Sequence, residues 1–91
     1  MRPSTNLNLM KALAVEVKRR RLELELTQED LAGRTELDRP YISLIEVARK
    51  QPTLSVLHKL AEGLECSLAG LMEQVEKRYA SDKRAKRKTT S

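Results

Sequence analysis

Residues 27–46 read TQEDLAGRTELDRPYISLIE, and this stretch decides the fold because it predicts two short helices joined by a tight bend. Thr27 is a favourable N-cap, since its hydroxyl can accept a hydrogen bond from a backbone N–H of the first turn. Asp30 can bond back to Thr27 in a capping box. Asp38 is the second predicted N-cap, and Pro40 follows in the first helical turn, where its missing N–H costs nothing.

The second predicted helix has an inward face and an outward face. Ile42 and Ile45 are three residues apart and, with Leu37, form an apolar stripe that faces the core. The residues that point outward are Arg39, Pro40, Ser43 and Leu44. A helix supported from behind and presented by a shorter helix is the helix-turn-helix arrangement, whose second helix enters a DNA major groove.

Five blocks of sequence follow one another in a recognisable order: LTQEDLA at 26–32, YIS at 41–43, Glu46, PTL at 52–54 and LA at 60–61. In this order they resemble the Cro/C1-type (XRE) family of phage and bacterial repressors, over about residues 13–72. The resemblance implies an all-α, five-helix, lambda-repressor-like DNA-binding domain with the helix-turn-helix at its second and third helices. It also implies an ion pair between Arg21 and Glu46 that joins the first helix to the third.

Two positions depart from the family pattern. Glu36 in the turn and Ala48 after the second helix stand where the family often has glycine. Glycine relieves a left-handed backbone conformation, so both residues put the local turn geometry in question. Neither touches the core pattern.

The positive charge of the chain is concentrated at one end. The 91 residues carry a formal net charge of +5, but residues 1–76 hold 11 basic and 12 acidic side chains, whereas residues 77–91 hold 7 basic and 1 acidic. The first part therefore has a net charge of −1 and the second part +6. Any affinity for DNA must come from a local patch together with the tail.

The composition predicts one small domain with an aliphatic core, because the chain has fifteen leucines and neither Phe nor Trp. We expect residues 1–8 to be a flexible arm, residues 9–76 to form the domain, and residues 77–91 to be a disordered basic tail, since highly charged segments bury too little to stay ordered. The tail is read either as an arm along DNA phosphates or as a solubilising terminus.

Catalytic and metal-binding patterns are absent from the sequence. A single histidine, His58, and a single cysteine, Cys66, leave no Ser/His/Asp or Cys/His set, no metal-ligand spacing and no internal disulfide. No apolar run approaches the ~20 residues of a membrane span, and no signal-peptide pattern follows Met1. We therefore expect a cytoplasmic protein that is not an enzyme and has no cofactor or metal.

The resemblance and the helix positions together indicate the DNA contacts. Arg39 is the strongest base reader, because a guanidinium matches guanine O6 and N7. Ser43 can serve either strand, whereas Pro40 and Leu44 could only meet thymine methyls or exclude water. Gln28 begins the first of the two helices, where its amide could also bridge to the head of the second. The expected phosphate contacts are Gln28, Tyr41, Arg49, Lys50, Gln51 and Thr53.

The expected function is a sequence-specific regulator of transcription, a repressor by resemblance, that binds a pseudo-palindromic operator in double-stranded DNA as a homodimer. The expected dimer surface is Val56, Cys66, Leu68, Leu71, Met72 and Val75. The size and layout also fit controller proteins of restriction–modification systems. The alternative is a protein-interaction module on the same fold, either an antitoxin that binds a toxin or a bridge to the transcription machinery.

Overall fold

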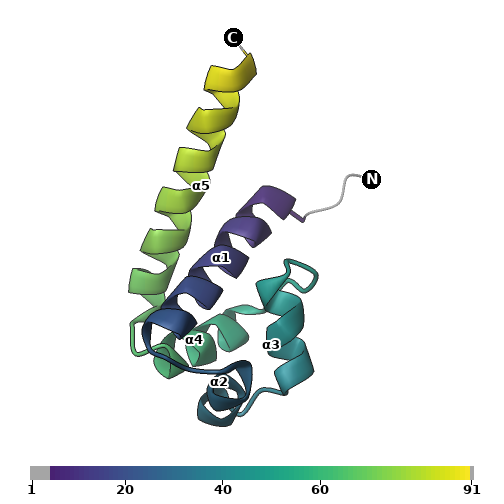
Figure 1. Cartoon of the computed structure of the whole chain (residues 1–91), viewed down its shortest axis with the longest axis vertical. Coiled ribbons are helices and arrows are strands. Elements are labelled where there is room, and N and C mark those ends of the chain that lie inside the picture. Colours follow the sequence, from purple (N-terminus) through teal and green to yellow (C-terminus); the bar gives the residue numbers. More distant parts are fainter. Residues whose placement is uncertain (1–4, 91) are drawn as a thin grey trace.

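The computed structural model describes the backbone of residues 5–90 and the side chains of residues 5–84. This part of the chain folds into five α-helices: α1 (Leu7–Glu23), α2 (Gln28–Thr35), α3 (Arg39–Glu46), α4 (Leu54–Gly63) and α5 (Leu68–Thr90). Helices α1 and α5 lie side by side, and α2, α3 and α4 pack below and beside α1 (Figure 1). The predicted all-α, five-helix fold is confirmed.

The core is aliphatic, as the composition predicts. Its largest fully buried side chains come from the first four helices and the C-cap of α4: Val17, Leu31, Ile42, Ile45, Leu60 and Leu64. Helices α2 and α4 approach closely where Gly63 faces Thr35, and a Cβ atom on Gly63 would lie only 2.6 Å from the Thr35 methyl group. Helix α3 in turn packs against α2 and α1.

Helix α1 begins earlier than the sequence suggested. It starts at Leu7, because the Asn6 side chain accepts a hydrogen bond of 3.0 Å from the Leu9 backbone N–H and so caps the first turn. It ends at Glu23. The arm expected over residues 1–8 is thus shortened by the first two residues of α1, and residues 1–4 lie outside the described part of the chain.

Helix α5 is longer than expected. It continues to Thr90, through the stretch that composition predicted to be disordered from residue 77. Two contacts with the start and middle of α1 hold it: Arg78 Nη2 lies 2.9 Å from Glu16 Oε1, and Asn6 Nδ2 donates to the Tyr79 hydroxyl at 3.1 Å. Ala, Lys and Arg in the last turns are also good helix formers.

Burial within the single chain bears on the expected dimer surface. Leu71 and Val75 are each only 3% exposed and belong to the core, so they offer almost no surface to a second copy. They occupy successive turns of the face that α5 lays against α1. The other four residues of that set are half-buried and pack against the core: Val56, Cys66, Leu68 and Met72.

Each of the first four helices is followed by a non-glycine residue in the left-handed conformation. These residues are Glu25, Glu36, Ala48 and Glu65, with φ between 58° and 59°. Glu36 and Ala48 are the two positions where the family often has glycine, so the turns keep a left-handed backbone although the residue has changed. An L-residue pays about 1–2 kcal/mol for this conformation.

Replacing Ala48 with glycine should therefore stabilise the protein. The relief of left-handed strain exceeds the ~0.4–1 kcal/mol that glycine adds to the entropy of the unfolded chain, so we expect a net gain of about 0.5–1 kcal/mol in urea unfolding. The matched control is Ala69→Gly, on an exposed helical residue of α5, which should lose about 0.5–1 kcal/mol. Destabilisation by both substitutions would contradict the strain at Ala48.

Candidate DNA-binding surface

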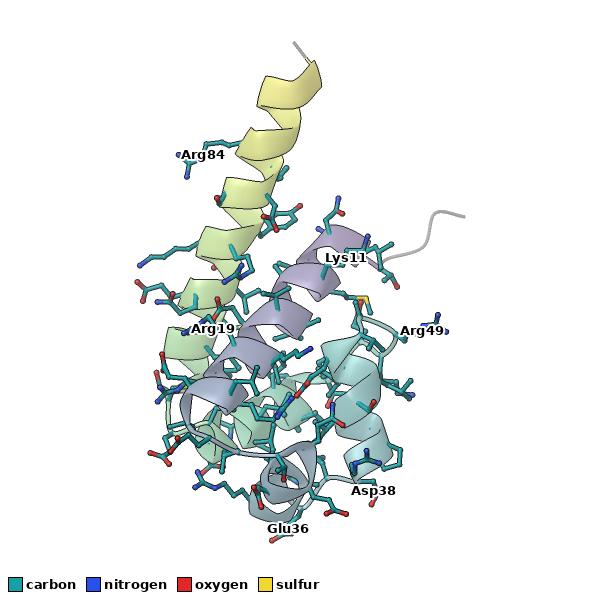
Figure 2. The ribbon with its side chains drawn as sticks, in the orientation of Figure 1. Lys11, Arg19, Glu36, Asp38, Arg49 and Arg84 are labelled. Carbon is teal, nitrogen blue, oxygen red and sulfur yellow. The ribbon has the colours of Figure 1, made fainter. Side chains whose placement is uncertain are left out.

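Helix α3 presents one face to solvent and one to the core. Ile42 and Ile45 are at most 1% exposed. The outward residues Arg39, Pro40 and Leu44 are exposed, and Ser43 is half-buried between the two faces. In Figure 2, Asp38 lies at the start of α3 and Arg49 points away from the body just past its end. The structure therefore places all four expected base readers on α3, three of them exposed.

A buried ion pair fixes the end of α3. Arg21 Nε lies 2.7 Å from Glu46 Oε2, and Arg21 Nη2 lies 2.9 Å from Glu46 Oε1, which is a two-point contact. The remaining guanidinium nitrogen, Nη1, donates to the Leu26 carbonyl at 2.7 Å. The Glu46 side chain is 3% exposed and that of Arg21 is 9% exposed. The hydrogen bonds to Glu46 raise the pKa of Arg21 further above its usual range.

Gln28 joins the same cluster, but not in the way that the sequence suggested. Its amide Nε2 donates to Glu46 Oε1 at 3.2 Å, at the C-terminal end of α3 instead of its head. The reason is that the first turn of α2 lies against the last turn of α3, where the carboxylate of Glu46 has an acceptor position left. Gln28 thereby links α2 to the Arg21–Glu46 pair.

The starts of α2 and α3 are capped differently. The Thr27 hydroxyl accepts from the Asp30 backbone N–H at 3.0 Å, and Asp30 Oδ2 accepts from the Thr27 backbone N–H at 2.9 Å, which completes the predicted capping box. The bond from the Thr27 backbone lowers the pKa of Asp30. Asp38 occupies the N-cap position of α3, yet its side chain makes no capping bond, and Pro40 stands in the first turn.

Four of the expected phosphate contacts lie on the exposed segment after α3: Arg49, Lys50, Gln51 and Thr53. The Lys50 ammonium group lies 5.8 Å from the centre of the half-buried Tyr41 ring, so this cation is placed beside the outer side of α3. The Thr53 hydroxyl accepts from the Val56 backbone N–H at 3.2 Å and caps α4.

The basic run at residues 18–21 serves mainly to hold the fold. Arg19 bonds to Glu16 and Glu23, and Arg20 Nε donates to the Leu64 carbonyl at 2.9 Å, at the end of α4. With Arg21 committed to Glu46, only Lys18 of the four has no such partner among the described residues. Three of the four residues of the run are therefore engaged in contacts within the fold.

One feature of the surface was not anticipated from the sequence. Arg39 lines a shallow recess of about 380 Å³ at the start of α2, together with Gln28 and Glu29. The exposed Leu22 of α1 lies in the same recess. The only signal in the sequence was that Leu22 falls off the inward stripe of the first helix.

Breaking the Arg21–Glu46 pair should strongly destabilise the protein, because one charge would stay buried without its partner. We expect Glu46→Gln to lower the free energy of unfolding by about 3–5 kcal/mol, measured by urea denaturation at neutral pH. Glu62→Gln is the control, since that carboxylate is 69% exposed and pairs only with His58; it should change stability by less than about 0.5 kcal/mol. Equal effects of the two substitutions would show that the buried pair contributes no more to the free energy of unfolding than an exposed one.

The described residues offer neither a metal site nor a membrane span. No group of three or more His, Cys, Asp or Glu side chains in residues 5–90 could hold a metal ion. None of the helices described combines the length and the apolar character that a span requires.

Comparison with known proteins identifies the family. The helix-turn-helix domain family matches residues 17–71. The control protein C.MunI of Mycoplasma sp is 37% identical over 60 residues, which cover 66% of this chain and 81% of that protein. The description of this relative as a control protein agrees with the expectation that the chain is not an enzyme.

Solved structures show the same arrangement. The restriction–modification controller protein C.Esp1396I superposes with a TM-score of 0.72 at 38% identity, over 77% of this chain and 92% of that one. The structure of its tetramer in complex with its natural 35 base-pair operator superposes with a TM-score of 0.74, over 79% of this chain and 95% of that one. The clp gene regulator ClgR from Corynebacterium glutamicum gives 0.84 over 97% and 92%, but at 20% identity it shares the fold alone. The chain belongs to the Cro/C1-type (XRE) helix-turn-helix family of DNA-binding transcription regulators.

Proposed function

We propose that the chain is a controller-type transcription regulator that binds a pseudo-palindromic operator in double-stranded DNA through α3. The observation that carries this proposal is the geometry of α3, which is held from behind by the core and by the Arg21–Glu46 pair. A helix fixed in this way can present side chains to base edges without losing further conformational freedom on binding. The relatives C.MunI and C.Esp1396I, at 37% and 38% identity, support the controller assignment.

In this proposal, Arg39 is the main base reader. It is exposed at the first position of α3, and a guanidinium can bond to guanine O6 and N7 in a bidentate fit. Ser43 can donate or accept one hydrogen bond, whereas Pro40 and Leu44 offer only apolar contact with thymine methyl groups. Direct readout is consequently modest, and DNA shape supplies part of the specificity.

Phosphate contacts supply most of the affinity. Arg49 and Lys50 follow α3 on an exposed segment and carry two positive charges to the rim of the groove. Gln28, Tyr41, Gln51 and Thr53 add polar groups around them. Because residues 1–76 have a net charge of −1, these few local cations must provide the attraction of the domain to the DNA phosphates.

Substitution separates the two kinds of contact. Arg39→Ala should cost about 1–3 kcal/mol on the preferred site and relax the preference at one base position of each half-site. Lys50→Ala should weaken all duplexes about equally and flatten the slope of log K against log salt by ~1. Binding to a set of single-base variants of the site distinguishes the two. A uniform loss for Arg39→Ala would make it a phosphate contact.

The function itself is tested by selecting bound fragments from a pool of random duplexes. A regulator of this kind enriches one pseudo-palindromic site, with binding that weakens steeply as salt rises. If repeated rounds of selection enriched no sequence, sequence-specific operator binding would be excluded. The chain would then be better described as a protein-interaction module.

Two copies are needed to read such a site, since one eight-residue helix spans few base pairs. A two-fold dimer would place both α3 helices roughly 34–36 Å apart on successive major grooves. For the contact surface, we propose the exposed apolar area around a groove of about 550 Å³ between α1, α4 and α5. Its lining includes Leu9, Met10, Leu57, Met72 and Tyr79.

Leu54 provides a clean test of this surface. It is 70% exposed and lies one turn before Leu57 on α4, so Leu54→Glu should leave the fold intact and raise the dimer dissociation constant at least ~10-fold. Leu22→Glu is the control, because Leu22 is 56% exposed but lies on the α2 side of α1. Sedimentation velocity at micromolar concentration measures both. An unchanged dimer for Leu54→Glu, or a monomeric parent protein, would exclude this surface.

A further inference from the structure

We infer that the C-terminal part of α5, residues 80–90, is a second phosphate-binding surface, which contacts a duplex segment other than the one that α3 enters. This inference rests on the proposed function, because it takes DNA as the polyanion. It differs from the operator contact in the elements and residues that it uses.

The fold anchors α5 just before this segment. Leu71 and Val75 are buried against α1. Arg78 then bonds to Glu16 through Nε at 3.1 Å and Nη2 at 2.9 Å, and the Glu16 side chain is only 5% exposed. Tyr79 accepts from Asn6. The helix therefore leaves the body in a fixed direction, and Figure 1 shows it projecting past the start of α1.

Beyond Tyr79, the helix stands apart from the body. Residues 80–84 are all exposed, and within the part of the chain whose side chains are described no hydrogen bond or ion pair joins them to another helix. Lys83 lies 5.2 Å from the centre of the Tyr79 ring on its own helix. Residues 80–84 therefore add nothing to the core.

The charge of the segment is one-sided. Residues 80–90 contain five basic residues and a single acidic one, Asp82, for a net charge of +4. The basic residues are Lys83, Arg84, Lys86, Arg87 and Lys88. Pairs such as 83 and 87 or 84 and 88 are four residues apart on the helical backbone, a spacing at which like charges destabilise a helix. A polyanion removes this repulsion, and a nucleic-acid backbone offers phosphates at regular spacing.

The direction of α5 separates this surface from the operator contact. Helix α1 packs against both α5 and α3 and lies between them (Figure 1). Arg84 and Arg49 point to opposite sides of the molecule (Figure 2). A duplex held in its groove by α3 therefore lies on the far side of α1 from residues 80–90, which are left to meet a different segment of DNA.

The experiment measures whether one protein holds two duplexes. A biotinylated duplex carrying the selected operator is immobilised with the full chain, and capture of a second, fluorescent duplex of random sequence is recorded. The test variant is K83Q/R84Q/R87Q/K88Q, which keeps good helix formers while removing four charges. The control is K83R/R84K/R87K/K88R, which keeps every charge.

We expect the parent protein and the charge-preserving control to capture the second duplex, and the Gln variant to lose at least ~10-fold of this capture. The preference for the operator should be the same in all three. Capture should fall as salt rises, with a slope that the Gln variant flattens by up to ~3–4. The inference is overturned if the parent captures no second duplex, if the Gln variant captures it as well as the parent does, or if the control fails like the Gln variant.

Arg39→Ala separates this result from the proposed function. On a random immobilised duplex, Arg39→Ala should still capture the second duplex, although its operator preference is reduced. Loss of operator preference in every protein, with capture intact, would exclude the operator proposal and leave the α5 surface standing. Loss of capture in Arg39→Ala to the level of the Gln variant would assign bridging to α3 and overturn the inference.

Discussion

The orientation of α3 depends on the buried contact between Arg21 and Glu46. Helix α3 has only eight residues, and no side chain caps its start, so it would not be stable by itself. The core holds its middle through Ile42 and Ile45, and the ion pair holds its end. A buried ion pair often contributes little net stability, because removing both charges from water is costly. Here its effect is positional: Arg21 and Gln28 tie α1 and α2 to the last residue of α3, the helix that we propose to enter the DNA groove.

Several other features of the molecule follow from its small size, which limits both the core that it can bury and the surface that it can offer to DNA. A small aliphatic core buries a limited share of the chain, and the left-handed turns at Glu36 and Ala48 subtract from its stability. Two of the four residues in the basic run of α1 link it to other parts of the fold, Arg20 to the end of α4 and Arg21 to α3, and Arg19 bonds to carboxylates of α1 itself. Few cations therefore remain on the side of α3. This scarcity fits the proposal that two copies are needed for specificity, and the excess positive charge of the chain lies on α5.

The sequence predicted what local pattern and family resemblance can determine. The Thr27 capping box and the inward stripe of α3 are local features, and the Arg21–Glu46 pair came from the family pattern. Contacts between distant residues were not accessible: Glu16 and Arg78 are 62 positions apart, and no spacing rule connects them. Periodicity likewise indicated that Leu71 lies on an apolar helix face, but it could not show that α1 covers that face. Composition predicted disorder from residue 77, whereas the described backbone is helical to Thr90, and the contacts of Arg78 and Tyr79 that anchor this part of α5 could not be read from composition.

The most direct test of the central claim is a double-mutant cycle between Arg39 and the base that it is proposed to read. Kd is measured for the parent protein and Arg39→Ala, each on the selected operator and on the same operator with 7-deazaguanine, which lacks the N7 acceptor. If Arg39 on the fixed helix reads guanine, the modified base should cost the parent about 1–3 kcal/mol and the variant almost nothing. Equal costs for both proteins would mean that Arg39 does not contact this base, and the account of α3 as the reading element would be contradicted.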